Sequence, residues 1–481
     1  MLVLEKFWMA TEFFVRKLKQ EIKIVLMQTS DEQKYRSSVA DPSPTVRMFY
    51  KKHAELAAVS LSDEQQQLFD RLENSSSHFF VTGKAGTGKS VLLQHFKYTS
   101  NKKLVVVAPT GVAALNVGGQ TIHSLFHIPP EFITKDSLRL DYPVAHLLRQ
   151  LDAVVIDEVS MVRADLMDGI DYLLRSARRS DLPFGGVQMI LFGDLFQLPP
   201  VVSDPELHKY FADNHGGFYF FNADVWKTTS LEIVELSHVF RQHDESFKML
   251  LNAIRNGSAD ETVLAQLNKR ASTAVPSEGT ITLATTNQTV NEINEKKLAA
   301  LPGQVYEYYA EITGKLEKQS FPTEEILKLK PGAQVMLLKN DTEKRWVNGT
   351  LATIYSLSKE EVKINIDGII YSVSPATWSK VRYTYNRTNH KIEEEVTSSF
   401  TQFPLRLAWA VTIHKSQGHT YHSVIIDMGA GAFTHGQTYV ALSRCTNLET
   451  IYLKQKIIKE DIIVDRTVIA FMEKAIVLQA T

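Results

Sequence analysis

The sequence carries its clearest signal in one uninterrupted run, Val81-Thr82-Gly83-Lys84-Ala85-Gly86-Thr87-Gly88-Lys89-Ser90. The run fits the phosphate-loop pattern GxxxxGK[ST] and has the strand-to-helix setting that this pattern requires. Phe79–Val81 predicts a short buried strand before the loop, and residues 91–98 predict a helix after it. Glycines let backbone N–H groups surround phosphates, Lys89 adds a positive charge, and the Ser90 hydroxyl suits Mg²⁺. The run therefore predicts a site for a nucleoside triphosphate.

Three further apolar runs follow, and each leads into polar residues: Leu104–Val107, Ala153–Ile156 and Val187–Phe192. Such runs are typical of parallel strands covered on both faces, which bind ligands at their carboxyl ends. The second run ends in Asp157 and Glu158, where the Asp can hold Mg²⁺ and the Glu can polarise the water that attacks a γ-phosphate. The third leads to Gln197, whose amide can hydrogen-bond the γ-phosphate or that water.

The second half of the chain has a comparable strand pattern but no second phosphate loop. Ile281–Ala284 and Val424–Asp427 predict buried strands there. An α/β domain without its own loop is expected to contribute across a shared cleft, and arginine is suited to neutralise transition-state charge from that position. Arg241 and Arg444 are the two candidates, although an arginine taken alone is more typical of a surface ion pair.

Composition limits the class of protein. A chain of 481 residues is long enough for several domains, and its 53 basic residues nearly cancel 54 acidic ones. Only a local basic groove is therefore expected to bind nucleic acid. The one cysteine, Cys445, excludes an internal disulfide and fits a reducing compartment. No apolar run is long enough to predict a membrane span.

Residues 1–58 are the least informative part. Apolar residues recur at helical spacing from Phe7 to Val25, which predicts an amphipathic helix docked on its own protein, with a partner-binding or membrane-surface helix as the alternative. Residues 28–47 are rich in Ser, Asp and Pro and predict a linker.

Several longer stretches resemble the motifs of one family, the petite-integration-frequency (PIF-type) DNA helicases of superfamily one. Residues 111–126 resemble motifs Ia and Ib, residues 404–418 resemble motif V, and Gln437–Arg444 resembles motif VI. Asp165–Val201 is similar to the signature that separates this family from its relatives, and Leu61–Gln65 resembles the Q motif. The resemblance spans about residues 60–455 in the family's order, which is more specific than any single pattern.

The resemblance implies an ATP-dependent DNA helicase that moves 5′→3′. It implies that the catalytic residues are Lys89, Asp157, Glu158, Gln197, Arg241 and Arg444, and that the Mg²⁺ ligands are Ser90 and Asp157. The implied nucleotide contacts come from the loop Gly83–Ser90 and from Gln65 on the adenine, Gln197, Arg241, Gly418 and Arg444. The implied contacts with single-stranded DNA come from Pro109, Thr110, Gly111, Thr121, His123, Phe126, Thr412, His414 and Lys415.

The chemistry of the DNA set agrees with this assignment. Single strands are held by cationic or hydrogen-bonding groups along the backbone and by aromatic rings where bases stack. Thr412, His414 and Lys415 suit phosphate contacts, and His123 or Phe126 suits a stacking face. Taken alone, Phe126 is more typical of a core residue, and His414 is as typical of a packed histidine as of a ligand contact.

The strand pattern together with this resemblance implies an α/β fold class, with two RecA-like domains, a small wedge insertion and an inserted SH3-like β-barrel. The predicted boundaries are 1–58 for an N-terminal extension, 59–202 for RecA-like domain 1A with wedge 1B at about 127–149, 203–304 and 400–481 for RecA-like domain 2A, and 305–399 for barrel 2B. Short alternating strands predict the barrel, as do Asn348-Gly349 and Asp367-Gly368, which favour tight hairpin turns.

Alternatives remain open at this level. A nucleotide kinase uses the same loop but does not need motifs in both halves; an ATP-gated single-strand clamp binds DNA without unwinding it; a related recombination or conjugation helicase lacks the 165–201 signature. The expected partners are single-stranded and forked or tailed duplex DNA, with G-quadruplex DNA as a further candidate, and no membrane. A monomer is expected, acting in DNA replication, repair, recombination or telomere maintenance, in a bacterial cytoplasm or nucleoid or otherwise in a nucleus or mitochondrion.

Overall fold

The computed structural model describes residues 60–129, 131–202, 204–240, 242, 244–273, 280–316, 318–343, 345–386 and 391–480. The helix and linker predicted within residues 1–58 lie outside the described residues. Among the described residues, no helix combines the length and the hydropathy that crossing a bilayer requires.

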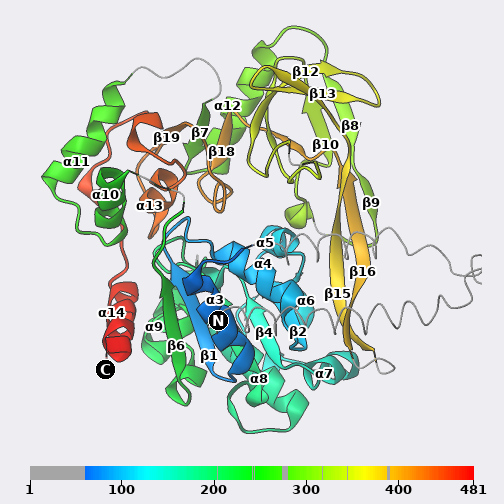
Figure 1. The fold of residues 1–481 in the computed structure, drawn as a ribbon, viewed down its shortest axis with the longest axis vertical. Coiled ribbons are helices and arrows are strands. Elements are labelled where there is room, and N and C mark those ends of the chain that lie inside the picture. The colour runs from blue at the N-terminus through cyan, green and yellow to red at the C-terminus, as the bar shows by residue number, and fades with distance from the viewer. Residues whose placement is uncertain are drawn as a thin grey trace, which may run out of the picture. The chain divides into compact units, whose positions relative to one another are not determined.

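The first sheet contains the phosphate loop and is parallel throughout. Its strand order is β3-β2-β4-β5-β1-β6 (Figure 1). The strands are β1 (His78–Gly83), β2 (Leu104–Ala108), β3 (Gln120–Thr121), β4 (Ala153–Ile156), β5 (Gln188–Phe192) and β6 (Leu231–Leu236). The strands predicted from uninterrupted apolar runs are thus confirmed.

Alternating residues of each strand enter two separate cores, one on each face of the sheet. Phe79 and Val81 pack with Leu92 of α4, whereas Phe80 between them packs in the other core with Met167 of α8. The helices of this domain are α3 (Asp63–Asn74), α4 (Lys89–Thr99), α5 (Gly111–Val117), α6 (Ile122–Phe126), α7 (Tyr142–Leu148), α8 (Ala164–Arg178) and α9 (Pro205–His215). Coverage on both faces explains why the central strands β2 and β4 carry no polar residues.

The first domain extends further than the predicted boundary at residue 202. Strand β6 pairs in parallel with β1 from His78↔Leu231 to Gly83↔Leu236, so residues up to Leu236 belong to the first sheet. As the last strand in the order, β6 has a neighbour on one side only and is half-buried along most of its length. Polar residues such as Glu232 and Glu235 are therefore tolerated, which obscured the strand in the sequence.

The second α/β domain has a smaller parallel sheet with the order β18-β7-β19-β20. These strands are β7 (Ile281–Ala284), β18 (Ala410–Thr412), β19 (Val424–Asp427) and β20 (Ile451–Leu453), and the helices are α10 (Glu245–Arg255), α11 (Glu261–Asn268), α12 (Asn287–Ala300) and α13 (Gln437–Leu442). The chain then ends in α14 (Arg466–Ala480). Helix α14 packs on the first domain, where the Phe471 ring stacks on Phe221 with centroids 4.1 Å apart.

An antiparallel β unit interrupts the second domain. A five-stranded sheet has the order β14-β13-β12-β11-β17, and β15-β16-β9 and β10-β8 form two further sheets. The strands are β8 (Tyr306–Tyr309), β9 (Glu311–Thr313), β10 (Ile326–Leu329), β11 (Gln334–Leu337), β12 (Leu351–Leu357), β13 (Val362–Ile366), β14 (Ile369–Val373), β15 (Ala376–Asn386), β16 (Lys391–Gln402) and β17 (Leu405–Leu407).

Two sequence predictions for this β unit need correction. Asp367 and Gly368 form the expected tight turn between β13 and β14, with φ of 50° and 87°. Asn348-Gly349 instead lies near the end of the longer connection between β11 and β12, so it is not a two-residue hairpin turn. The unit also continues past the predicted end at residue 399, because β17 pairs with β11.

The long hairpin β15–β16 reaches the first domain (Figure 1). The Tyr383 hydroxyl donates to Val106 O and accepts from Val106 N–H, at 3.3 Å each, and Gln120 Oε1 accepts from Tyr383 N–H at 3.2 Å. Lys97 of α4 pairs with Glu394 of β16 at 3.0 Å. The hairpin pairs with β9 of its own unit near one end and contacts β2 and β3 of the first sheet with residues further along its length.

Candidate active site

The phosphate loop has the backbone geometry that its glycines predict. Gly86 and Gly88 have φ of 87° and 80°, which L-residues with side chains rarely adopt, and Gly88 is the N-cap of α4. The Lys89 ammonium donates to the loop carbonyls Gly83 O at 2.5 Å and Lys84 O at 3.1 Å. The loop therefore presents the N-terminus of α4 together with a lysine, which is a site for phosphate.

The carboxylates of Asp157 and Glu158 lie just beyond β4. Asp157 continues the strand ladder through its N–H to Val107 O at 2.9 Å, and Glu158 turns away with a φ of 50°. Burial raises the pKa of both carboxyls above their ordinary values; the neighbouring Glu158 raises that of Asp157 further, and Lys89 opposes both shifts. A divalent cation between the Ser90 hydroxyl and Asp157 would offset this crowding of negative charge, so these residues fit Mg²⁺.

Gln197 lies in a buried polar network that the sequence did not predict. Its Nε2 donates to Asp194 Oδ2 at 3.2 Å, and its Oε1 accepts from Gln417 Nε2 at 3.2 Å. Arg255 of α10 approaches Asp194 Oδ1 at 3.3 Å and lies over the Phe196 ring at 3.9 Å. Because Arg255 and Gln417 come from the second domain, the network joins both domains at the loop that follows β5.

Arg444 is brought to the same site from the second domain. It is 1% exposed, and its guanidinium donates to the backbone oxygens Val440 O, Ser416 O and His419 O. Burial raises the pKa of Glu158, and the positive charge of Arg444 across the cleft opposes part of this rise. Nearby, the Tyr439 hydroxyl accepts a hydrogen bond from Ala85 N–H of the phosphate loop at 3.2 Å, a contact that the sequence analysis missed.

These groups surround one cavity of ≈ 730 Å³. The predicted residues that line it are Gln65, Ala85, Gly86, Thr87, Gly88, Lys89, Ser90, Asp157, Glu158, Gln197, Gly418 and Arg444. Gly83 and Lys84 are not among the lining residues; their backbone oxygens accept hydrogen bonds from the Lys89 ammonium. Arg241 lies outside the described residues.

Sequence reasoning missed other lining residues: Ser60, Val91, Gly193, Asp194, Phe240, Thr420 and Thr446. Phe240 was adjacent to a candidate arginine, and Asp194 follows a predicted strand, so both carried a local signal. Phe240 N–H donates to Gly86 O at 2.9 Å, and its half-exposed ring lies near Gly88, as the Gln65 side chain does.

The residues predicted to contact DNA lie at helix starts and loops. Thr110 and Thr121 cap α5 and α6 by accepting from Ala113 N–H and Ser124 N–H. His123 is half-buried with Nδ1 3.2 Å from Ile128 O, and burial lowers its pKa. Pro109 is half-buried as well.

Phe126 is a correction to the predicted DNA-contacting set. It is 0% exposed in the core of the first domain, so its ring offers no stacking face. It ends the short helix α6, whose inner face this side chain fills together with Ile122.

Lys415 joins a second cavity, of ≈ 480 Å³, between α5 and the β unit. Thr412 Oγ1 accepts from Lys415 N–H at 3.2 Å, and burial lowers the pKa of both His414 and Lys415. The cavity combines cations and aromatic rings with two carboxylates; its charged and aromatic lining is Lys318, Phe321, Glu324, Glu325, Trp378, Arg406, Lys415 and His419. Cations beside aromatic rings are the pattern that holds single-stranded nucleic acid.

Comparison with known proteins connects these sites to one family. Residues 60–264 match the family model PIF1-like helicase, and residues 312–357 match DNA helicase Pif1, 2B domain. The chain is 35% identical over 401 residues to ATP-dependent DNA helicase PIF1 of Homo sapiens, covering 81% of this chain and 60% of that protein. It is 32% identical over 406 residues to ATP-dependent DNA helicase Pif1 of Bdellovibrio bacteriovorus, covering 82% and 88%. The chain thus spans about 60% of the length of the human relative.

Solved structures give the same picture. Unliganded Pif1 from Bacteroides sp is 40% identical and superposes with a TM-score of 0.80, covering 86% of this chain and 97% of that one. The complex of Bacteroides sp Pif1 with ADP-AlF4 also gives 0.80, at 39% identity and the same coverage. Bacteroides Pif1 bound to ssDNA gives 0.62 at 40% identity and the same coverage.

Proposed function

Because the chain belongs to the PIF1-like helicase family, we propose that it is an ATP-dependent DNA helicase that moves 5′→3′ along single-stranded DNA. One observation carries the proposal: a single cavity unites the phosphate loop and the Asp157–Glu158 pair of one domain with Arg444 of the other. A site shared by two domains couples hydrolysis to relative domain motion, which a nucleotide kinase does not require. The solved relatives in complex with ADP-AlF4 and with ssDNA support both ligands.

The residues of the cavity have distinct chemical tasks in this proposal. The loop amides and Lys89 bind the phosphates, and Ser90 and Asp157 hold Mg²⁺, which neutralises phosphate charge when bound. Glu158 accepts the proton of the attacking water, because burial has already raised the basicity of its carboxylate. Arg444 stabilises the charge that develops on the γ-phosphoryl group.

Movement follows from contacts that differ between the open and closed cleft. Two hydrogen bonds exist only while the two domains are close: Gln417 to Gln197, and Ala85 N–H to the Tyr439 hydroxyl. A nucleotide shifts the equilibrium only through such differential contacts. Alternating grip on the DNA by the two domains then gives directed steps.

The DNA path in this proposal runs by Thr110, Thr121 and Lys415, past the cavity between α5 and the β unit. At similar sequence identity, the chain superposes better on DNA-free relatives than on the ssDNA-bound one. We therefore assign the arrangement with the docked β15–β16 hairpin to the DNA-free state. The wedge at about 127–149 and an SH3-like character of the β unit belong to the same proposal, as do G-quadruplex substrates, a monomeric state, and action in a bacterial cytoplasm or nucleoid or else in a nucleus or mitochondrion.

A strand-displacement assay tests the function and its direction together. Purified protein is given ATP, Mg²⁺ and labelled duplexes with either a 5′ or a 3′ single-stranded tail. We expect unwinding of the 5′-tailed duplex only, and no unwinding by the matched variant Lys89→Ala. DNA-stimulated hydrolysis without any unwinding would identify a clamp instead, and unwinding from the 3′ tail would overturn the polarity.

A further inference from the structure

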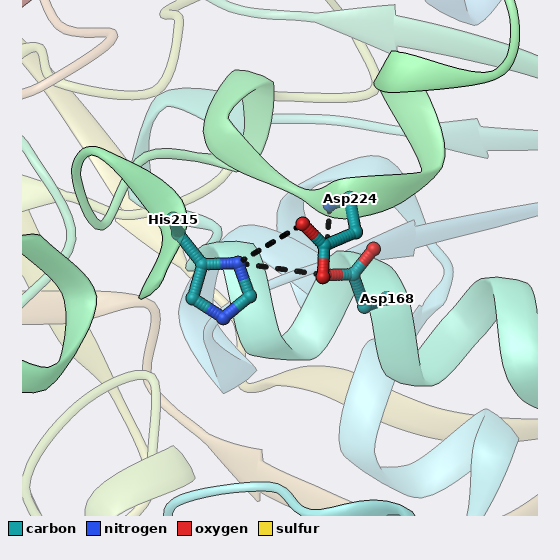
Figure 2. A group of neighbouring side chains, drawn as sticks. All are labelled: Asp168, His215 and Asp224. Carbon is teal, nitrogen blue, oxygen red and sulfur yellow. Dashed lines mark hydrogen bonds and ion pairs between the residues drawn. The ribbon is translucent and has the colours of Figure 1, made fainter. Parts of the chain in front are cut away.

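A cluster of three side chains lies outside the site described so far. Asp168 belongs to α8, His215 is the last residue of α9, and Asp224 begins the 3-10 helix η5 (Asp224–Lys227). The three potential ligand atoms lie within 4.8 Å of one another. Figure 2 shows one ring nitrogen of His215 facing the two carboxylates.

His215 is the informative member of this cluster. Its side chain is only 10% exposed, and no described residue hydrogen-bonds its buried Nδ1. The nearest oxygens are Asp168 Oδ2 at 3.8 Å and Asp224 Oδ1 at 3.9 Å, both beyond hydrogen-bond length. A buried nitrogen without a hydrogen-bond partner is costly, and this one faces two carboxylates with space between the three groups.

The Asp168 carboxylate is held in place as metal ligands are. Its Oδ2 accepts from Asp224 N–H and its Oδ1 from Val225 N–H, both at 3.0 Å. Hydrogen bonds of this kind fix the orientation of a carboxylate and still leave a lone pair on each oxygen for a metal ion. The hydrogen bond from Asp224 N–H keeps the two carboxylates close to each other. Their like charges repel, and a cation bound between them would reduce this repulsion.

We propose that Asp168, His215 and Asp224 form a binding site for a divalent transition-metal ion. One imidazole with two carboxylates suits zinc-like ions, whereas Mg²⁺ and Ca²⁺ prefer oxygen ligands alone. Ligands of a tetrahedral Zn²⁺ lie about 3.3 Å apart, so His215 Nδ1, now 3.8 Å and 3.9 Å from the two carboxylate oxygens, must approach them by roughly 0.5 to 0.6 Å. The adjoining cavity, of ≈ 690 Å³, has room for water as the fourth ligand.

The ion would cross-link α8, which follows the Asp157–Glu158 turn, to α9 and η5. The Lys227 ammonium, 2.6 Å from Asp224 Oδ1, is the present counter-ion, and its side chain is 63% exposed. It can therefore leave when a metal binds. This site is independent of the proposed helicase activity.

Zinc titration of the full chain tests the proposal. The untagged protein is stripped with a chelator, and Zn²⁺ is added against a chromogenic competitor, with excess Mg²⁺ to occupy the phosphate-loop site. We expect one equivalent of tightly bound zinc. Asp168→Asn and His215→Gln should each weaken binding more than about 100-fold, since the loss of a group that only hydrogen-bonds to a metal ligand already costs roughly 10–100-fold in affinity. The control Asp213→Asn, on the exposed face of α9, should bind like the wild type.

Two further measurements separate a metal site from a merely structural cluster. Lys227→Gln removes the competing ammonium and should tighten zinc binding about threefold. Zinc should raise the thermal midpoint of the wild type and of Asp213→Asn but not that of His215→Gln, with circular dichroism verifying that each variant is folded. Equal zinc uptake by wild type, Asp168→Asn and His215→Gln would overturn the proposal, as would no uptake by the wild type.

Discussion

Glu158 is the side chain whose loss should separate binding from chemistry. In Glu158→Gln the amide keeps the shape of the cavity but cannot accept a proton from water, so hydrolysis should fall at least about 100-fold. Nucleotide affinity should change less than about threefold, because Lys89 and the loop amides are untouched. Single-turnover hydrolysis and fluorescent-nucleotide binding measure the two effects, with Glu206→Gln on exposed α9 as the control. An unchanged hydrolysis rate would remove Glu158 from the mechanism.

We expect His78 to make folding sensitive to acid. Burial lowers its pKa to about 4, and its Nδ1 accepts from Met189 N–H at 3.1 Å. The unfolded chain, with an ordinary pKa near 6.5, then binds more protons, so the His78 contribution is complete above pH 6.5 and is lost as pH falls toward 4. In His78→Asn, whose amide oxygen still accepts, the acid loss of unfolding free energy should be smaller by up to about 3 kcal/mol. Urea titrations from pH 4 to 7 measure this difference; parallel pH profiles would contradict it.

At this scale the sequence predicted contacts that are local along the chain. The loop Gly83–Ser90 and the pair Asp157–Glu158 were found because the residues of each lie together in the sequence, at or directly after the end of a single strand. Asp194 with Arg255, and Ala85 with Tyr439, were missed because their partners come from the other domain; the last two residues are 354 positions apart. Phe126 shows the converse, since a family motif includes core residues as well as contacts with ligand.

Among the elements, the β15–β16 hairpin should oppose DNA binding. Tyr383→Phe removes the hydroxyl that both donates to and accepts from Val106, which destabilises the docked hairpin by about 1 kcal/mol. If the docked form excludes DNA, single-strand affinity should then rise up to about fivefold. Fluorescence anisotropy with a labelled oligonucleotide measures the change. Tyr355→Phe, an exposed tyrosine of the same β unit, is the control and should leave affinity unaltered. Weaker binding by Tyr383→Phe would show that the hairpin supports DNA binding.

Elements were predictable where both faces of a strand are buried. β2 and β4 appear as uninterrupted apolar runs and β7 and β19 as mostly apolar ones, and all four were found. β6 was missed because an edge position relaxes that requirement, and β17 was assigned to the wrong domain because its pairing with β11 is long-range. The docking of the β15–β16 hairpin depends on contacts with another domain, which no local pattern encodes.

For the molecule as a whole, Gly436 lies at a position where the two α/β domains approach each other closely. It has a φ of 72°, and a Cβ there would lie 2.4 Å from Phe196 O and 2.5 Å from Gln197 O. Gly436→Ala should therefore hold the domains apart and lower DNA-stimulated ATP hydrolysis at least about tenfold. Gly303→Ala, with a φ of 87° and nothing within 4 Å, has the same backbone strain without the clash. Equal hydrolysis by the two variants would show that this approach is not needed.

The chain crosses between the two α/β domains twice, once after β6 and again before α14, which stacks Phe471 on Phe221. A line can be drawn through these two connections, and a rotation of one domain against the other about that line stretches neither connection. Sliding and free tumbling are resisted, so the connectivity itself selects one axis of rotation. In the proposed helicase, the path of the polypeptide would then set the direction of each domain rotation, and ATP hydrolysis would set only when it occurs.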